Sequence, residues 1–286
     1  CRKTRKIFFS FSAKRVALGA SRKQKFELHN VTGSIIRFEG KKVLKIERDL
    51  NALPFDVNNI EGTVDEPHYA RLVGLEDFEN GTIEVKMYSQ LQDPPPYPGI
   101  AGFIGIYFRI KDDDSAFEGI YLRPKVGRAT RQFSRNHAVQ YISYPHAKFD
   151  TLRKSYPPGS YEGSAPVSLN EWIKMRIEVN GETAEMFIND MKYSSFIVDK
   201  MLGRHKTGGV GLYVDIGTIG YFKDLKVTKD QNIVFIREGW GNKDNAGRTA
   251  WRGRSAWPSR RWQPRTRWAG SHSRTRTAST PATLDR

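Results

Sequence analysis

Side chains suited to binding a sugar are concentrated between residues 107 and 162. Aromatic rings cover the apolar face of a sugar ring, while guanidinium and amide groups bind hydroxyls or carboxylates in pairs. The stretch therefore predicts a carbohydrate-binding face, and the alternative is a solvated sheet face with ordinary surface ion pairs. The candidate binding residues are Tyr107, Arg109, Tyr121, Arg123, Asn136, His137, Gln140 and Tyr141.

Two glutamates in the same stretch, Glu118 and Glu162, are the candidate catalytic carboxylates, because glycosidic bonds are cleaved between two such groups. Strand alternation puts Glu118 on the same side as Ile120 and Leu122, the aliphatic side, which weakens its candidacy. No predicted strand carries two carboxylates at alternate positions. The sequence leaves two functions open: a glycoside hydrolase and a non-catalytic carbohydrate-binding or adhesion module.

The net charge of the 286 residues is +16, and it comes from the two ends of the chain. Residues 1–25 hold nine basic and no acidic residues, whereas 237–286 hold twelve basic and three acidic ones. The part between them carries a net charge of −2. This distribution argues against nucleic acid as the partner of the central part. No apolar run is long enough to span a membrane, and the lone cysteine excludes an internal disulfide.

Residues 26–236 divide into short alternating runs separated by turn residues, which predicts an all-β domain. Asn180-Gly181 between two such runs predicts a β-hairpin. About twelve strands over this length favour a two-sheet antiparallel jelly roll. Trp172 begins one strand and is expected to anchor the core. The expected strands are 34–38, 41–47, 69–73, 82–88, 102–109, 117–122, 138–143, 172–179, 182–188, 195–198, 209–214 and 220–228.

The residue pattern of several strands resembles the concanavalin A-like lectin/glucanase superfamily, including its laminin-G-like and glycoside hydrolase family 16-like jelly rolls. Residues 78–85 follow the pattern F-x-x-G-x-I-E-V, and residues 102–109 follow G-x-x-G-I-x-F-R. The segments 170–172 and 209–224 resemble the closing strands of the same superfamily. The resemblance implies a jelly roll that binds glycans on one sheet, in a secreted or cell-surface protein.

The resemblance also bears on catalysis and on metals. Retaining glucanases of this kind carry E-x-D-x-x-E on one strand, and the nearest string here, residues 61–67, has the wrong spacing. Polysaccharide lyases with this fold use Arg, Gln, His and Tyr side chains, which leaves a lyase as a third alternative. No cofactor is required, but structural calcium is an option, because Asp224 matches a calcium-ligand position of these domains.

The two ends differ from the middle in composition. Residues 1–25 are expected to be a basic leader, either disordered or the remnant of an export signal. Residues 237–286 contain five of the six tryptophans among arginines, without strand or helix periodicity. They are expected to form a disordered tail, which need not be native sequence.

Overall fold

The computed structural model describes residues 15–18, 24–231 and 233–236 of the chain. Most of the expected leader and the whole expected tail lie outside the described residues. Residues 15–18, which belong to that leader, form a strand that pairs with the start of the domain. In the described part of the chain, none of the helices is long and apolar enough to cross a membrane.

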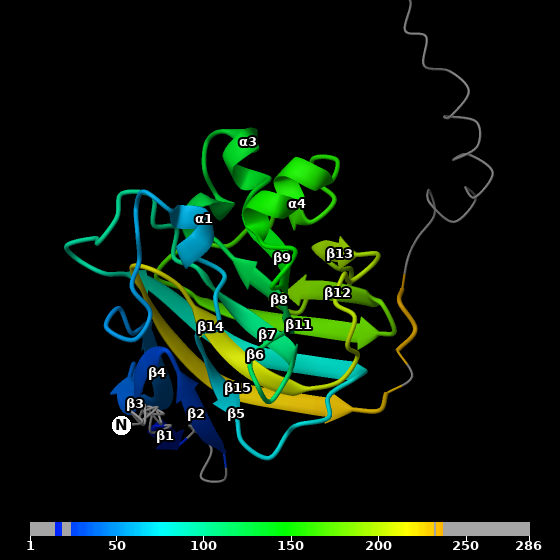
Figure 1. The fold of residues 1–286 in the computed structure, drawn as a ribbon, viewed down its shortest axis with the longest axis horizontal. Coiled ribbons are helices and arrows are strands. Elements are labelled where there is room, and N and C mark those ends of the chain that lie inside the picture. The colour runs from blue at the N-terminus through cyan, green and yellow to red at the C-terminus, as the bar shows by residue number, and fades with distance from the viewer. Residues whose placement is uncertain (1–14, 19–23, 232, 237–286) are drawn as a thin grey trace, which may run out of the picture. The chain divides into compact units, whose positions relative to one another are not determined.

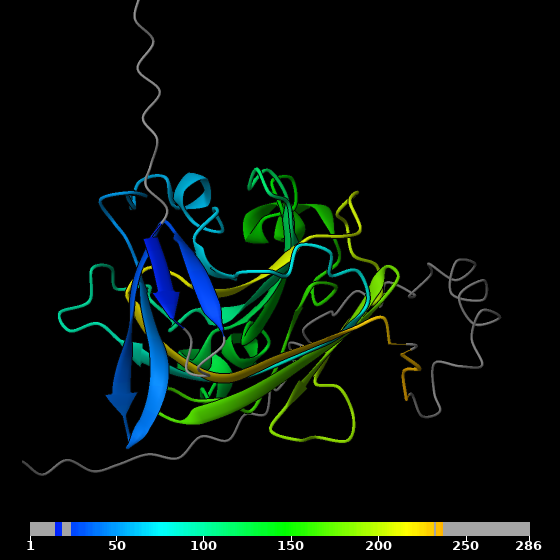
Figure 2. The ribbon, with the colours of Figure 1, turned by 90° about the horizontal axis from the view of Figure 1, so that it is seen from below.

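Two antiparallel sheets face each other (Figures 1 and 2). In spatial order, the eight-stranded sheet contains β1 (Arg15–Leu18), β2 (Lys25–His29), β5 (Tyr69–Leu72), β14 (Gly209–Val214), β7 (Ile104–Ile110), β8 (Phe117–Leu122), β9 (Val139–Tyr144) and β10 (Glu162–Gly163). The seven-stranded sheet contains β13 (Phe196–Val198), β12 (Thr183–Ile188), β11 (Trp172–Asn180), β6 (Gly81–Leu91), β15 (Thr218–Lys229), β4 (Lys41–Arg48) and β3 (Val31–Phe38). The predicted jelly-roll sandwich is thereby confirmed.

Four short helices lie in the connections: α1 (Ile60–Thr63), α2 (Pro124–Gly127), α3 (Gln132–Arg135) and α4 (Phe149–Ser155). Figure 1 shows α1, α3 and α4 gathered on one side of the sandwich. None of the four reaches eight residues, in keeping with a sequence that carries no extended helical periodicity.

The two sheets differ in how their faces are covered. In β6 and β11, buried residues alternate with half-buried ones, so one face of the seven-stranded sheet packs inside and the other faces outward. Every residue of β7 and β8 is buried, so both faces of the eight-stranded sheet are covered there. The face turned away from the sandwich core must therefore lie beneath other parts of the chain.

All twelve expected strands are present, with ends shifted by at most three residues. Asn180-Gly181 joins β11 to β12 as expected, with Gly181 at a φ of 61°. The sequence reading missed β1, β2 and β10.

The expectation for Trp172 was wrong. Its indole is half-buried on the outward face of the seven-stranded sheet, where Nε1 donates to Glu39 Oε2 at 2.6 Å. Lys223 Nζ lies 3.3 Å from the centroid of the indole ring, and Tyr88 packs against its edge. Because alternate residues of a strand face opposite sides, the neighbouring Ile173 points into the core and is fully buried.

We expect the two neighbours to differ in their effect on stability. Ile173→Ala should lower the free energy of unfolding by about 2–5 kcal/mol, because it opens a cavity in the core. Trp172→Ala should cost only about 1–2 kcal/mol, the worth of a few aromatic and cation–π contacts. Denaturant unfolding of both variants measures the difference, and a larger loss for Trp172→Ala would contradict this assignment of faces.

Candidate functional site

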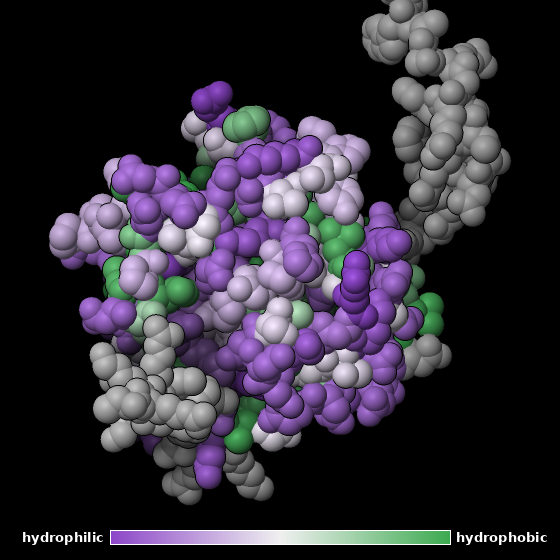
Figure 3. Space-filling view, viewed as in Figure 1, coloured by the Kyte–Doolittle hydropathy of each residue, from purple (hydrophilic) through white to green (hydrophobic). Residues whose placement is uncertain are grey.

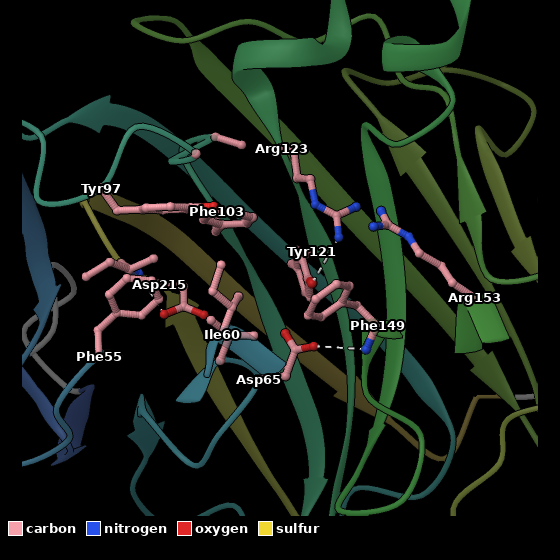
Figure 4. A pocket seen from close by; sticks show the side chains of 14 residues that line it. Phe55, Ile60, Asp65, Tyr97, Phe103, Tyr121, Arg123, Phe149, Arg153 and Asp215 are labelled. Carbon is pink, nitrogen blue, oxygen red and sulfur yellow. Dashed lines mark hydrogen bonds between the residues drawn. The ribbon is translucent and has the colours of Figure 1, made fainter. Parts of the chain in front are cut away.

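The covered face of the eight-stranded sheet contains a pocket of about 310 Å³ (Figure 4). Its floor comes from β8, and its walls come from the segment between β4 and β5, the segment between β6 and β7, the α4 region and the turn after β14. The volume lies at the lower end of the range for small-molecule sites, about 300–1,000 Å³. The aromatic and charged side chains that line it are Phe55, Asp65, Tyr97, Phe103, Tyr121, Arg123, Phe149, Arg153 and Asp215.

Aromatic rings make up much of the pocket wall. Phe55 and Tyr97 come from two different segments, and their ring centroids lie 5.3 Å apart. Phe103 packs edge-on against Tyr121 at 6.2 Å. The guanidinium of Arg153 lies 5.3 Å from the ring centroid of Phe149. The pocket therefore combines aromatic faces with charged groups.

Glycines on β7 and β8 make room for the large side chains of this face. A Cβ atom on Gly119 would lie 2.7 Å from the ring of Tyr107, and one on Gly105 would lie 2.5 Å from Cβ of Tyr121. A side chain at Gly119 would displace the ring of Tyr107, and one at Gly105 would clash with the backbone of β8 at Ile120 and Tyr121.

Five of the predicted site residues meet in one network beside the pocket. Arg123, which is buried, donates to the carbonyl oxygen of His137 at 2.8 Å and to Gln140 Oε1 at 3.1 Å. It also lies 3.3 Å from the hydroxyl of Tyr121 and 3.3 Å from Glu162 Oε1. The register pairs β8 with β9 and β9 with β10, so these side chains share one face.

Glu162 is held in its ionised form by this network. Burial by itself would raise its pKa, but hydrogen bonds from Arg153 and the charges of Arg123, Arg153 and His137 lower it overall. Arg153 Nε donates to Glu162 Oε2 at 3.0 Å, and His137 Nδ1 lies 3.0 Å from the same oxygen. Glu162 therefore serves as the counter-charge of two arginines.

Asp215 is a second carboxylate held as an anion. Its carboxylate accepts three hydrogen bonds: from Arg48 Nη1 at 2.7 Å, from the backbone N–H of Ile216 at 2.6 Å and from the hydroxyl of Tyr213 at 2.9 Å. His68 Nε2 lies 3.3 Å away. Burial alone would raise the pKa of Asp215, but His68 and Arg48 hold it far below its usual range.

Asp65 has the opposite environment, although it lines the same pocket. Only 1% of the residue is exposed, and Oδ2 accepts from the backbone N–H of Phe149 at 3.1 Å. Burial and the negative charge of Asp215 raise the pKa of Asp65 to about 6, against the opposing effects of the Phe149 N–H, of Arg123 and of a hydrogen bond with Tyr121. Asp65 is thus a carboxyl group that exchanges its proton near neutral pH.

The backbone around Asp65 explains how it reaches the pocket. Asn59 caps α1 by accepting from the N–H of Gly62, and the helix ends at Thr63. Asp65 follows two residues later with a φ of 56°, in the left-handed region that aspartate tolerates better than most residues. Such a conformation at a buried polar residue is frequent at functional sites.

The structure separates the two predicted catalytic residues. Glu118 pairs with Ser143 in the β8–β9 ladder and points toward the sandwich interior, on the face opposite to Glu162. There it accepts from the hydroxyl of Tyr141 at 2.6 Å and from the N–H of Gly203 at 2.8 Å. Burial raises the pKa of Glu118. The geometry gives no support to Glu118 and Glu162 as a pair that flanks one bond.

Tyr141 and Arg109 also lie away from the predicted face. Tyr141 shares the inner face with Glu118, whereas its neighbour Gln140 joins the Arg123 network. Arg109 occupies an irregularity in the β7–β14 pairing, with a φ of 52°. This turns its guanidinium toward the backbone oxygens of Glu79 and Gly181, both 2.8 Å from Nη2, at the edge of the other sheet. The expected alternation fails at this residue because the strand bulges.

Two further predicted residues lie close to the site without lining it. Tyr107 is on the expected face, but it is fully buried between the rings of Phe117 and Tyr213, at 4.3 and 4.4 Å. Asn136 is exposed at the end of α3, where Oδ1 accepts from Gln132 Nε2.

Asp224 does not fit a calcium site. Its side chain is 60% exposed on the seven-stranded sheet, and its carboxylate lies 3.0 Å from Lys86 Nζ. Over the described ranges, no group of three or more His, Cys, Asp or Glu side chains is arranged to hold a metal ion. Calcium needs six to eight oxygen ligands, so nothing around Asp224 supports the predicted role.

Sequence reasoning missed the two aspartates and most of the pocket wall. Asp65 lies in the 61–67 string, which we tested only for strand spacing, and Asp215 lies in a turn. The aromatic residues Phe55, Tyr97 and Phe149 come from connections, where strand periodicity gives no information. The only sequence signal was the long connections themselves, since long loops in compact domains are often functional.

A second hollow, of about 620 Å³, lies beside the turn after β9. Lys111, His146, Arg204 and His205 line it, and its lining includes no aspartate or glutamate. It is larger but lacks the convergence of aromatic rings and buried charges that marks the first pocket. We therefore take the smaller pocket as the candidate site.

The face in Figure 3 is mainly hydrophilic, with hydrophobic residues in small separate patches.

Several solved structures are similar to this chain at low identity. A carbohydrate-binding module, CBM66 from Bacillus subtilis, is 12% identical and covers 69% of this chain and 94% of its own, with a TM-score of 0.41. A Bacillus licheniformis beta-glucanase is 12% identical, covering 70% and 83%, with a TM-score of 0.36. The exoplasmic/lumenal domain of VIP36 is 9% identical, covering 80% and 92%, with a TM-score of 0.39.

No family model and no curated protein sequence matches this chain. The similarity to solved structures thus concerns the fold alone.

We expect Asp65→Asn to make the protein more stable at neutral pH but not in acid. The pKa of Asp65 is 3.8 when exposed and about 6 in the folded protein, so the native state loses stability as pH rises between these values. Above pH 6 the loss in the free energy of unfolding amounts to about 3 kcal/mol. Urea unfolding at pH 4 and pH 7 should show the variant gaining stability over the wild type only at pH 7. An equal difference at both pH values would contradict this account.

Glu162→Gln should have the opposite effect on stability. It leaves the buried guanidinium of Arg123 without its counter-charge, which costs about 3–5 kcal/mol in comparable buried pairs. The matched control is Glu182→Gln, because Glu182 pairs with Lys206 at an exposed position and should cost less than about 1 kcal/mol. Thermal unfolding of both variants at pH 7 measures the contrast. Equal losses of stability in the two variants would contradict a larger contribution of the buried Arg123 network.

Proposed function

We propose that this protein is a glycan-active domain that holds one sugar residue of an oligo- or polysaccharide in the pocket on the covered face of its eight-stranded sheet. One observation carries the proposal: aromatic side chains and four charged groups converge on a single pocket. Rings such as Tyr97 and Phe149 suit the apolar face of a sugar. The carboxylates and guanidinium groups suit its hydroxyls.

Between the two finer functions, the pocket favours a glycoside hydrolase over a purely binding module. Two buried carboxylates, Asp65 and Asp215, line the same pocket in contrasting environments. Pairs of this kind are typical of sites that use one acid and one anion. The lyase alternative finds no such support, because Tyr141 lies on the other face of the sheet from Gln140 and Arg123.

A protein that acts on polysaccharides works where they are found, so the proposal includes a secreted or cell-surface location. Fractionation of the source cells, followed by detection of the chain outside the cytoplasm, tests this part independently.

We expect Tyr97→Ala to weaken glycan binding about tenfold, the loss of one stacking contact. The full chain is first tested against immobilised gluco-, galacto-, manno-, xylo- and fructo-oligosaccharides, and the affinity for the glycans that bind is then measured by calorimetry. Tyr193→Ala is the matched control, because this exposed tyrosine follows β12 on the other sheet. It should leave affinity unchanged.

Folded protein that binds none of these glycans would count against the proposal. Equal losses for Tyr97→Ala and Tyr193→Ala would place the binding surface elsewhere on the molecule.

A further inference from the structure

Two carboxylates from distant parts of the chain line the proposed sugar pocket. Asp65 follows α1, whereas Asp215 begins the turn between β14 and β15. Figure 4 shows both side chains at the same side of the pocket, with the aromatic rings of Phe55 and Phe149 beside them. A ligand that fills this pocket contacts both.

The hydrogen-bond partners of these carboxylates differ. Asp215 is surrounded by Arg48, His68, the hydroxyl of Tyr213 and a backbone N–H, all within 3.3 Å. Asp65 accepts from the backbone N–H of Phe149 and also interacts with the hydroxyl of Tyr121, and within the described part of the chain no Lys, Arg or His forms an ion pair with it. The ion pair with Arg48 thus keeps Asp215 ionised. Asp65 can bind a proton without breaking an ion pair.

From this arrangement we infer that Asp65 is the proton donor that cleaves a glycosidic bond of the sugar bound in the pocket, beside Asp215, which is paired with Arg48. The inference rests on the proposed function, and it specifies the reaction and the residue that acts as its acid. The acid contributes typically about 10²–10⁴-fold to such a reaction.

The bond changes are those of a hydrolysis. The carboxyl proton of Asp65 passes to the glycosidic oxygen while the bond from this oxygen to the anomeric carbon breaks, and the electron pair stays on the departing oxygen. The negative charge of Asp215 stabilises the positive charge that develops on the sugar ring. Water then adds its oxygen to the anomeric carbon and gives a proton to the Asp65 carboxylate, which restores the acid.

The environment of Asp65 suits this role. Burial and the charge of Asp215 raise the pKa of Asp65 to about 6, so a large fraction of the protein holds the proton in weakly acidic solution. Glu162 is the other carboxylate near the pocket, but Arg123 and Arg153 bind it and lower its pKa, so it is a poor donor. Glu118 lies on the opposite face of the sheet.

The test measures binding and turnover with the same glycan and the full chain. Calorimetry gives the affinity for an oligosaccharide that binds, and reducing-end release from it gives kcat and KM. Asp65→Asn should bind within about threefold of the wild type, because the amide oxygen still accepts from Phe149, and should lose at least about 100-fold in kcat. In the wild type, kcat/KM should fall as pH rises above about 6, and the residual activity of the variant should lack this decline.

Asp224→Asn is the matched control. It makes the same substitution at a residue with nearly the same left-handed backbone, a φ of 55° compared with 56° at Asp65. Asp224 is exposed on the other sheet, so this variant should keep the wild-type kcat and pH profile.

The possible failures are distinguishable. Binding without turnover of any bound glycan would overturn the inference and leave the proposed function standing. Undiminished turnover by Asp65→Asn would also overturn it, whatever the pH profile. Absence of both binding and turnover would refute the proposed function, and the inference would fall with it.

Discussion

The central strands of the eight-stranded sheet are buried on both faces, and the rest of the structure depends on this. A jelly-roll sandwich needs only one buried face per sheet, and the seven-stranded sheet follows that rule. In β7 and β8 the second face is also covered, by the connections that contain α1 and α4. Polar side chains on that face are consequently removed from water.

Burial of polar groups is costly unless each finds a partner, and this accounts for the networks around the pocket. Arg123 is satisfied by three side-chain oxygens and a carbonyl, and Asp215 by Arg48 and the hydroxyl of Tyr213. Asp65 differs from both, because its partners are the backbone N–H of Phe149 and the hydroxyl of Tyr121, and among the described residues no cation pairs with it. The lack of a paired cation separates Asp65 from Glu162 and Asp215, which arginines hold as anions.

The sequence was informative wherever a local rule decides the structure. Alternation and turn residues located twelve strands and the Asn180-Gly181 hairpin, and they placed Tyr121 and Arg123 on one face. They failed at Arg109, because its bulge and its bonds to distant carbonyl oxygens depend on the partner strand. They could not reveal Asp65 either, since its neighbours in space are separated from it by up to 150 residues.

The position of Asp65 carries a cost that folding alone does not explain. A neutral amide of the same shape would keep the hydrogen bond from Phe149 and avoid a buried charge next to Asp215. Packing therefore gives no reason for a carboxyl group at this position, and the left-handed backbone would accept asparagine equally well. The chemical difference between the two side chains is the exchangeable proton. In the hydrolysis proposed above, this is the proton that is transferred, and the pocket holds it beside aromatic rings and the Asp215 carboxylate. The proposed reaction would thus account for the cost in stability.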